Sequence, residues 1–404
     1  MITGKDFVFT GLQPWDIPIG SNARDIALEV SKHNRVLYVN TPLDKKTYRS
    51  KSEAPDIIHR QNTVKGKTHC LRQISNSLWV LDYPFTVLPI NFLPDGKLFD
   101  LANKYNNTKM YTFVKKILRQ LKFEDYILFI DNDIYRSFYA VKYLEPKISI
   151  YYRRDNMQPI SFWKKHASRL EPLLESKSDI VLCNSLQLAQ SASKFNSYSY
   201  DVGQGVDLSG YQPDPTLKTP EDLVCIKHPI IGYAGSINSL RLDADLIYRL
   251  ACTHTNFSFV LVGACDGFFK SHKLNELRNV HFLGQKPQEL VANYISHFDV
   301  CINPQLKNEI TEGNYPRKID EFLALGKPVI ATATSTMNLF KEHVYLCSSA
   351  DDFTEALTKA MQEDNEEKRT ERIRFAHSHS WENSVKSIYK HILLLENQHE
   401  HIDH

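Results

Sequence analysis

The sequence has no long hydrophobic run and no clustered cysteines, and these absences exclude several classes of protein. No apolar run reaches about eighteen residues, so we expect no transmembrane helix. The seven cysteines are scattered without a Cys-x-x-Cys pair, which favours reduced, buried thiols in a cytosolic protein over a disulfide framework. The chain opens on a strand-like stretch, so no signal peptide is expected either.

The chain also lacks a strong charge of either sign. Its 404 residues carry a formal net charge of +2, with 24% charged and 42% hydrophobic residues. So small a charge gives no argument for nucleic-acid binding by itself, and we expect no such partner. The composition is that of an ordinary globular protein, and the length supports two or three domains with large cores.

Short apolar runs alternate with helical patterns along the chain, which predicts βαβ units and parallel sheets. In the first half the expected strands are residues 6–10, 35–39, 78–81, 126–130, 148–152 and 180–183. In the second half they are residues 230–234, 258–262, 280–283, 300–303, 329–331 and 344–346. Each set would fill one doubly wound domain. The proline-rich stretch 207–220 separates them and marks a linker.

Residues 314–332 carry the most informative pattern in the chain. The stretch reads as a polar loop, a helix that opens at Pro316, a glycine stop and a buried strand. Arg317 and Lys318 stand at the helix start, and Glu321 follows about one turn later. Unpaired N–H groups, the helix dipole and two cations favour an anion, and the carboxylate can bind hydroxyls. The pattern predicts a site for a phosphorylated sugar, and so for a nucleotide-sugar.

This segment resembles the donor-binding motif of family 4 glycosyltransferases, which are retaining enzymes of the GT-B fold. One branch has the pattern Pro-x-Lys-x-x-Glu-[Tyr/Phe]-x-Ala-x-Gly-Lys-Pro-Val. The matching residues here are Pro316, Lys318, Glu321, Phe322, Ala324, Gly326, Lys327, Pro328 and Val329. The family's fuller motif has two glutamates eight positions apart, whereas Glu312 and Glu321 are nine apart. Either one residue is inserted here, or Glu312 is not the first glutamate.

The resemblance implies an α/β protein with two doubly wound Rossmann-like domains that face a central cleft. Gln204-Gly-Val-Asp207 is similar to the Asn-Gly-Val-Asp that ends the first domain in this family. A C-terminal amphipathic helix with a serine cap is expected to cross back to the first domain. The expected parts are an acceptor-binding domain (1–206), a linker (207–226), a nucleotide-sugar-binding domain (227–378), the crossing helix (379–396) and a tail (397–404).

The second domain offers further donor contacts after two of its expected strands. A turn with Gly235 and Ser236 joins strand to helix, which suits close approach of a phosphate, although a plain tight turn gives the same pattern. In the family this turn faces the donor diphosphate and precedes an Arg and a Lys. Only Arg241 is present here, so Lys318 would supply the second charge. The family reads the base with backbone near Gln285, where a plain strand-end turn is the alternative.

In the first domain the expected site residues lie in two loops at the carboxyl ends of strands, where parallel sheets bind ligands. Gly20 and Ser21 stand where relatives often have Gly-Gly near the phosphates; Ser21 can also cap the following helix, and both interpretations can hold. Trp15 would either stack on an acceptor sugar or pack under its loop. Relatives have His-Asp where Arg154 and Asp155 stand. Arg154 would neutralise the leaving diphosphate or pair with a surface carboxylate.

The implied site contains catalytic and donor-binding residues. The catalytic ones are Arg154, Asp155, Arg241 and Lys318, and the donor-binding ones are Gly20, Ser21, Gly235, Ser236, Gln285, Glu312, Gly313, Asn314, Tyr315, Pro316 and Glu321. Asp131 and Asp133 have the Asp-x-Asp spacing of metal-dependent GT-A transferases, but nothing else in the chain suggests that fold. We interpret them as loop caps, and expect no metal and no other cofactor.

A basic helix is expected over residues 107–123, with apolar side chains on one face and lysines elsewhere around it. A core-packed helix with a solvated basic face accounts for this pattern, and the alternative is contact with anionic lipid headgroups. The basic loop 44–51 adds charge in the same domain. Docking at the inner face of the membrane would suit a lipid-linked acceptor. We expect a cytoplasmic protein, with the membrane surface as a further candidate partner.

Together with these observations, the resemblance implies a retaining glycosyltransferase that moves a sugar from a nucleotide-diphosphate sugar to a glycan or lipid-linked acceptor. The expected context is synthesis of a cell-surface polysaccharide or glycoconjugate. Helix N-termini, Arg241 and Lys318 would stabilise the leaving diphosphate without a metal, and Glu321 would bind the ribose hydroxyls. The alternatives are a GT-B nucleotide-sugar epimerase or hydrolase, and a non-catalytic nucleotide-sugar-binding protein.

Overall fold

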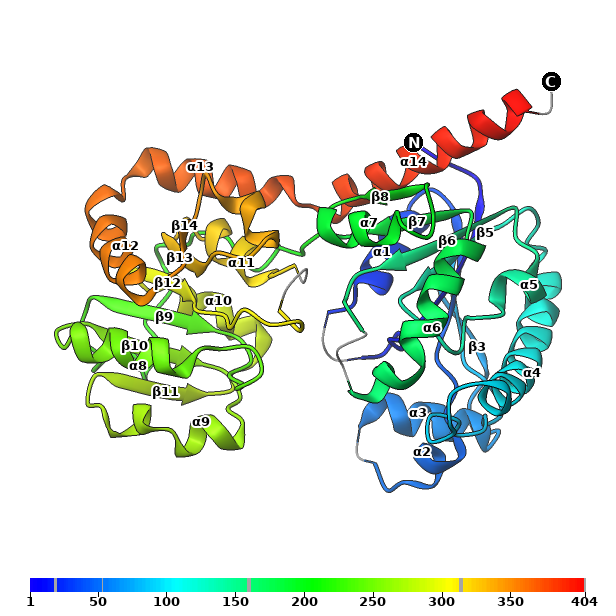
Figure 1. The fold of residues 1–404 in the computed structure, drawn as a ribbon, viewed down its shortest axis with the longest axis horizontal. Coiled ribbons are helices and arrows are strands. Elements are labelled where there is room, and N and C mark those ends of the chain that lie inside the picture. Colours follow the sequence, from blue (N-terminus) through cyan, green and yellow to red (C-terminus); the bar gives the residue numbers. More distant parts are fainter. Residues whose placement is uncertain (18–19, 53, 158–160, 312–314, 403–404) are drawn as a thin grey trace. The chain divides into compact units, whose positions relative to one another are not determined.

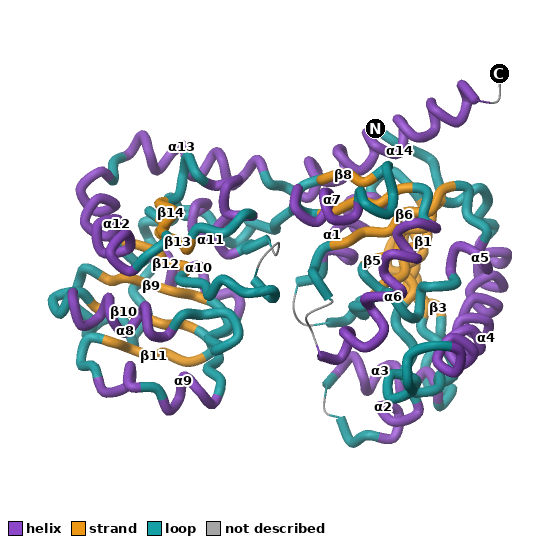
Figure 2. Tube along the Cα trace, in the orientation of Figure 1, coloured by secondary structure: helices purple, strands orange, loops and turns teal. Residues whose placement is uncertain are grey.

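The computed structural model describes residues 1–17, 20–52, 54–157, 161–311 and 315–402, and the chain divides into two compact units (Figure 1). Unit 1 comprises Met1–Gly203 and Trp381–His404, and unit 2 comprises Gln204–Ser380. In each unit, helices cover both faces of a largely parallel sheet (Figure 2). The expected pair of doubly wound α/β domains is confirmed.

Unit 1 is built on an eight-stranded sheet with the order β3-β4-β2-β1-β5-β6-β7-β8. Its strands are β1 (Asp6–Gly11), β2 (Arg35–Val39), β3 (Leu71–Ser75), β4 (Leu78–Leu81), β5 (Ile127–Asp131), β6 (Ile148–Arg153), β7 (Ile180–Cys183) and β8 (Ser199–Asp201). Neighbouring strands are parallel except β3 and β4. All six predicted strands are present. The two edge strands, β3 and β8, were not predicted, because their side chains are half-buried or exposed and give no apolar run.

The helices of unit 1 are α1 (Asn22–Ser31), α2 (Lys45–Arg49), α3 (Pro55–Val64), α4 (Lys97–Leu121), α5 (Ala140–Leu144), α6 (Ser161–Lys177), α7 (Leu186–Ala192) and α14 (Trp381–Ile402). Side chains of α4, α5, α6 and α7 fill the core on one face of the sheet, and those of α1 and α14 fill the core on the other. The C-terminal helix thus crosses back to the first domain, as expected. It continues to Ile402, so most of the segment expected as a tail (397–404) is helical, since no proline or glycine stops it.

Helix α4 begins about ten residues before the basic helix expected over 107–123. Besides Phe99, its first turns bury three asparagines (Asn103, Asn106 and Asn107), which hid the helical periodicity. Asn106 exchanges two hydrogen bonds with the backbone of Leu88 (2.9 and 3.0 Å). Asn107 donates to the Tyr135 carbonyl (3.2 Å). These polar contacts fix the helix against the preceding loop and the loop after β5.

Unit 2 has a parallel six-stranded sheet with the order β11-β10-β9-β12-β13-β14. Its strands are β9 (Ile230–Ala234), β10 (Ser258–Val262), β11 (Val280–Gly284), β12 (Val300–Asn303), β13 (Val329–Thr332) and β14 (Tyr345–Cys347), all predicted to within a residue or so. Its helices are α8 (Ala244–Thr253), α9 (Gly267–Ser271), α10 (Gln288–Ser296), α11 (Lys318–Ala324), α12 (Ala350–Glu363) and α13 (Glu366–Ser378), with short 3₁₀ helices η1 (Lys273–Glu276) and η2 (Thr336–Phe340).

The segment expected as a linker, 207–226, lies within unit 2. Leu208, Tyr211 and Leu223 are buried in one of the two cores of that unit, so the segment packs on the domain that it precedes. Among the described residues, no helix is long and apolar enough to cross a membrane.

Candidate functional site

The strand order of unit 2 brings the sequence-predicted donor residues to one edge of its sheet. Strand β9 lies between β10 and β12. The chain first adds β10 and β11 on one side of β9, and then adds β12, β13 and β14 on the other side. At such a switch point the loops after the two central strands diverge, and ligands bind outside their carboxyl ends. The turn after β9, which carries Gly235, stands at this position.

Lys318, the first residue of α11, holds its ammonium group against this turn. Its Nζ atom donates a 2.6 Å hydrogen bond to the Tyr233 hydroxyl and lies 4.4 Å from the centre of the Tyr233 ring. A Cβ atom added to Gly235 would lie 2.9 Å from the same Nζ. The structure therefore brings together the glycine turn and the lysine that the sequence proposed as its missing charge. Tyr233, at the end of β9, was not predicted.

Two glycines make the backbone of this edge unusually close-packed. Gly235 and Gly263, after β9 and β10, have φ angles of +143° and +151°, which residues with a side chain rarely adopt. A Cβ on Gly263 would lie 1.8 Å from the Gly235 carbonyl oxygen. The Gly235 N–H donates to the Val262 carbonyl (2.9 Å). The two turns thus support each other through the backbone, and only glycine fits at Gly263.

Ser236 and Arg241 follow the Gly235 turn and are both exposed. The Ser236 carbonyl accepts a hydrogen bond from the Tyr233 hydroxyl (3.0 Å), and its Oγ accepts one from Asn238 (3.1 Å). Within the described ranges, no ion pair or hydrogen bond engages the guanidinium of Arg241. Its charge is therefore available to an anion near the turn.

Glu321 is half-buried on α11, and its carboxylate accepts a hydrogen bond from the Tyr211 hydroxyl. Tyr211 in turn accepts a bond from Gln288 (3.0 Å). Burial raises the pKa of the Glu321 carboxyl, although the charges of Arg317 and Lys318 oppose this shift. Sequence reasoning identified Glu321 but missed Tyr211, because it lies more than a hundred residues earlier in the assumed linker.

Hydrogen bonds around the buried Asp320 carboxylate also hold the start of α11 in place. The Asp320 Oδ1 atom lies 2.7 Å from Nδ1 of His379, and the Tyr315 hydroxyl lies 3.2 Å from the same nitrogen. Pro316 is buried beside them, and α11 begins two residues after it instead of at it. The expected site residues Glu312, Gly313 and Asn314 lie outside the described residues.

Gln285 directly follows β11 and is exposed. It lines a hollow of about 350 Å³ together with Gly263, Cys265, Phe282 and Gly284. This hollow lies at the carboxyl ends of β10 and β11, beside the Gly235 turn. The contact with the nucleotide base that was expected near Gln285 stays a prediction.

In unit 1, Arg154 and Asp155 follow β6 and form a partly buried ion-pair group with Asp131. Arg154 donates to Asp131 (Nε–Oδ1 2.9 Å) and to Asp155 (Nη1–Oδ2 2.5 Å). Asp131 is fully buried at the end of β5, which raises the pKa of its carboxyl against the charge of Arg154. The interpretation of Asp131 as a loop cap is wrong, since it is the partner of Arg154. Asp133 does cap its loop, by accepting from the Arg136 N–H (3.1 Å).

The loop before α1 gives plain structural roles to two predicted residues. Ser21 caps α1, as expected, by accepting a bond from the Arg24 N–H (3.4 Å), and Gly20 lies exposed just before it. Trp15 packs edge-on against Tyr38, with ring centres 5.2 Å apart and planes at 71°. Of the two interpretations of Trp15, the structure favours packing under the loop.

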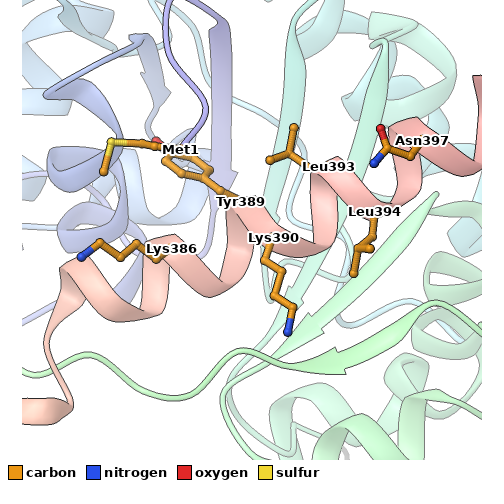
Figure 3. A pocket seen from close by; sticks show the side chains of 7 residues that line it. All are labelled: Met1, Lys386, Tyr389, Lys390, Leu393, Leu394 and Asn397. Carbon is orange, nitrogen blue, oxygen red and sulfur yellow. The ribbon is translucent and has the colours of Figure 1, made fainter.

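A further hollow, of about 470 Å³, lies beside α14 in unit 1 (Figure 3). It is lined by Met1, Lys386, Tyr389, Lys390, Leu393, Leu394 and Asn397. Met1 precedes β1, so this hollow lies toward the amino end of that strand. It is remote from the strand ends that carry Ser21 and Arg154, and it contains none of the predicted site residues.

Comparison with known proteins agrees with this arrangement. A family model described as glycosyl transferases group 1 matches residues 228–363, which is most of unit 2. The putative teichuronic acid biosynthesis glycosyltransferase TuaH of Bacillus subtilis (strain 168) is 26% identical over 241 residues, which cover 57% of this chain. The match spans 60% of the length of that relative.

Solved structures share the fold over nearly the whole chain. Sucrose-phosphate synthase from Thermosynechococcus elongatus matches with a TM-score of 0.64 at 14% identity, over 98% of this chain and 100% of its own. HepE of Anabaena, in complex with UDP, matches with a TM-score of 0.64 at 14% identity, over 96% and 99%. The catalytic domain of starch synthase IV from Arabidopsis thaliana, bound to ADP and acarbose, gives 0.63 at 15%, over 97% and 99%. On this evidence the chain has the GT-B fold, and most of its unit 2 is similar to the group 1 glycosyl transferases.

Proposed function

We propose that this protein is a retaining glycosyltransferase that uses a nucleoside-diphosphate sugar as donor and a glycan or lipid-linked molecule as acceptor. The observation that carries the proposal is the placement of the Lys318 ammonium at the Gly235 turn, 2.6 Å from the Tyr233 hydroxyl. A fixed cation beside a close-approach glycine turn suits a diphosphate. The name of the TuaH relative supports a role in the synthesis of a cell-surface polysaccharide.

In the proposed reaction, the bond between the anomeric carbon of the sugar and the β-phosphate oxygen breaks. A bond from the same carbon to the acceptor oxygen forms on the same face, which retains the configuration. The acceptor proton passes to the leaving phosphate, and the charge of that phosphate is stabilised by Lys318 and Arg241. Because Lys318 is already held by Tyr233, it needs no reorganisation as the charge develops.

Glu321 is proposed to bind the ribose hydroxyls of the donor. Its carboxylate is oriented by the Tyr211 hydroxyl. Because Glu321 stands three residues after Lys318, one short helix presents both the ammonium group and the carboxylate. The hollow that Gln285 lines would receive the base. Arg154 already pairs with two carboxylates, and the proposal that it also neutralises the leaving diphosphate stays a prediction.

The test is a donor screen with purified protein. Uridine, guanosine and adenosine diphosphate sugars are each tested by thermal shift, the uridine series first because HepE has been solved with UDP and with UDP-glucose. A ligand at about 100 times its Kd should add about 2.7 kcal/mol of stability. If no nucleotide-sugar stabilises the protein, the proposal is wrong.

The donor that binds is then incubated with and without candidate acceptors, and free nucleotide and product are measured. Transfer requires nucleotide release that depends on the acceptor. Release that proceeds equally without an acceptor would indicate a hydrolase or epimerase, and binding without any turnover would indicate a non-catalytic protein. The anomeric configuration of the product, read by NMR, decides whether the transfer is retaining.

A further inference from the structure

Large apolar side chains are exposed together at the start of α4 in unit 1. Leu98 is 57%, Leu101 is 68% and Tyr105 is 58% exposed, and Phe92 in the preceding loop is 73% exposed. The spacing of the three helical residues, three and then four positions, places them on one face of the helix. Exposed apolar side chains of this size on one helix face are typical of interaction surfaces. We call these four residues the α4 stripe.

The α4 stripe is presented by rigid structure. The opposite face of the helix is anchored by buried side chains, among them Phe99 and the two asparagines bonded to neighbouring loops. In the loop before the helix, the Phe92 carbonyl accepts a bond from Lys165 (2.8 Å). Asp95 binds both His166 (3.0 Å) and Arg169 (2.7 Å). The exposure is therefore built into the fold and does not result from a loosely held segment.

Positive charges lie beside the α4 stripe and beyond it along the helix. The lysines at 97 and 104 flank it, and Lys116 and Arg119 continue its face toward the end of the helix. Within the part of the chain that the structure describes, no ion pair or hydrogen bond engages these four cationic groups. The single acid of the helix, Asp100, pairs with Arg169 (2.8 Å). The outer face of α4 is thus apolar at its start, with cations along one side of the stripe and toward the end of the helix.

Two cations that the sequence assigned to this basic helix have other roles. Lys109 donates to the Thr86 carbonyl (3.0 Å) and lies 4.3 Å from the centre of the Phe85 ring. Lys115 pairs with Glu145 (2.6 Å). The expected segment 107–123 therefore contains only part of the charge and none of the exposed apolar side chains, which lie upstream of it.

We propose that the outer face of α4, with Phe92, is a surface that docks on an anionic lipid bilayer. The apolar side chains would enter the boundary between headgroups and acyl chains, while the lysines and the arginine would meet lipid phosphates. A second copy of this chain is a poorer occupant, because a two-fold contact through this face would place like charges opposite each other. Docking here is separate from the donor chemistry, and no nucleotide-sugar is needed to observe it.

The experiment is co-sedimentation with vesicles in the absence of any nucleotide. Vesicles of phosphatidylcholine alone are compared with equimolar phosphatidylcholine and phosphatidylglycerol, at low and high salt. The intact chain should pellet with the anionic vesicles only, and less at high salt. The double variant Leu98→Ser/Leu101→Ser should lower the partition coefficient by about tenfold or more. Lys97→Gln/Lys104→Gln should lower it by about 25-fold, given about fivefold per cation near the surface.

A matched control exists on α14, which packs on the opposite face of the sheet. Leu393 and Leu394 are also exposed and lie near Lys386 and Lys390, so this surface has a similar mixture of groups (Figure 3). Leu393→Ser/Leu394→Ser should leave vesicle binding unchanged. Circular dichroism verifies that all variants are folded.

The proposal is overturned if the intact chain fails to pellet with anionic vesicles, or if the α4 and α14 double variants lose binding equally. Sedimentation velocity distinguishes the competing occupant. If Leu98→Ser/Leu101→Ser instead abolishes a dimer and leaves vesicle binding unchanged, the α4 stripe is a protein interface. Donor binding, measured separately by thermal shift, shows whether the proposed transfer function stands regardless of this result.

Discussion

The ammonium group of Lys318 lies 2.6 Å from the hydroxyl of Tyr233, and this bond joins the start of α11 to the end of β9. The same hydroxyl donates to the Ser236 carbonyl (3.0 Å), so it fixes the turn and the cation together. A charge held in this way needs no rearrangement to meet a diphosphate. Tyr233 therefore acts as a positioning residue for Lys318.

Replacing Lys318 by methionine should weaken donor binding by about ten- to a hundredfold, because a charged hydrogen bond contributes roughly 1.5–3 kcal/mol. Folding should be little affected, since the Tyr233 hydroxyl keeps its bond to the Ser236 carbonyl. Isothermal titration with the donor identified by the screen measures the effect. Lys359→Met is the matched control, as this lysine of the same unit is exposed on α12. Equal donor affinity in both variants would remove Lys318 from the site.

Much of the fold could be predicted because its signals are local. The twelve predicted strands are short apolar runs between helical patterns, and burial on both faces of a parallel sheet produces such runs directly. The helix and strand around Gly326 were likewise encoded in one contiguous segment. Edge strand β3 was missed because its side chains are half-buried or exposed and form no apolar run, and the start of α4 was missed because it buries Asn103, Asn106 and Asn107 while Leu98 and Leu101 are exposed.

The site was predictable only where one segment contains it. Lys318 and Glu321 lie on the same turn of α11, and their spacing alone pointed to a phosphate and hydroxyl site. Tyr233 and Tyr211 could not be found in this way, because both are distant in the sequence from their partners. Tyr233 meets Lys318, and Tyr211 meets Glu321, only in the folded domain. The pairing of Asp131 with Arg154 was hidden for the same reason, because it joins the ends of two adjacent strands.

Glu321→Ala should weaken donor binding by about ten- to a hundredfold, through loss of charged hydrogen bonds to the ribose. Its effect on folding should be smaller, because burial already raises the pKa of this carboxyl and so opposes its charge. Tyr211→Phe should give a weaker loss of affinity, as it leaves the carboxylate in place without its orienting hydroxyl. Titration of the same donor into each variant is the measurement. A folded Glu321→Ala protein with unchanged affinity would contradict the ribose role.

Activity should survive chelation by EDTA. Asp131 is already paired with Arg154, and Asp133 accepts the Arg136 N–H, so both carboxylates have structural roles in this unit. In the proposed reaction, Lys318 at the Gly235 turn stabilises the diphosphate instead. The measurement is the transfer rate before and after dialysis against EDTA, and after addition of Mg²⁺ or Mn²⁺. If EDTA abolishes the activity and either metal restores it, the prediction that the reaction needs no metal is wrong.

A buried carboxyl pair in unit 1 should make its stability depend on pH. Glu175 and Glu171 share the Arg153 guanidinium, at 3.0 and 3.6 Å, and all three side chains are buried. Burial raises the pKa of Glu175 from 4.5 to about 7; the charge of Arg153 opposes this shift and that of Glu171 adds to it. At pH values between 4.5 and about 7, Glu175 keeps its proton in the folded state and has released it in the unfolded state. The stabilisation is therefore complete at low pH and is lost as the pH rises toward 7.

Glu175→Gln should remove this dependence, since the amide cannot titrate. The free energy of unfolding of the intact chain should fall by up to about 1.4 kcal/mol per pH unit, and by about 3 kcal/mol in all, across that window. Urea unfolding at several pH values measures it, and all four tryptophans lie in unit 1, so their fluorescence follows this unit alone. Glu124→Gln, at an exposed glutamate of the same unit, is the control and should keep the slope of the intact chain. If Glu175→Gln keeps the same slope as well, Glu175 does not retain its proton in the folded state, and Arg153 compensates its charge fully.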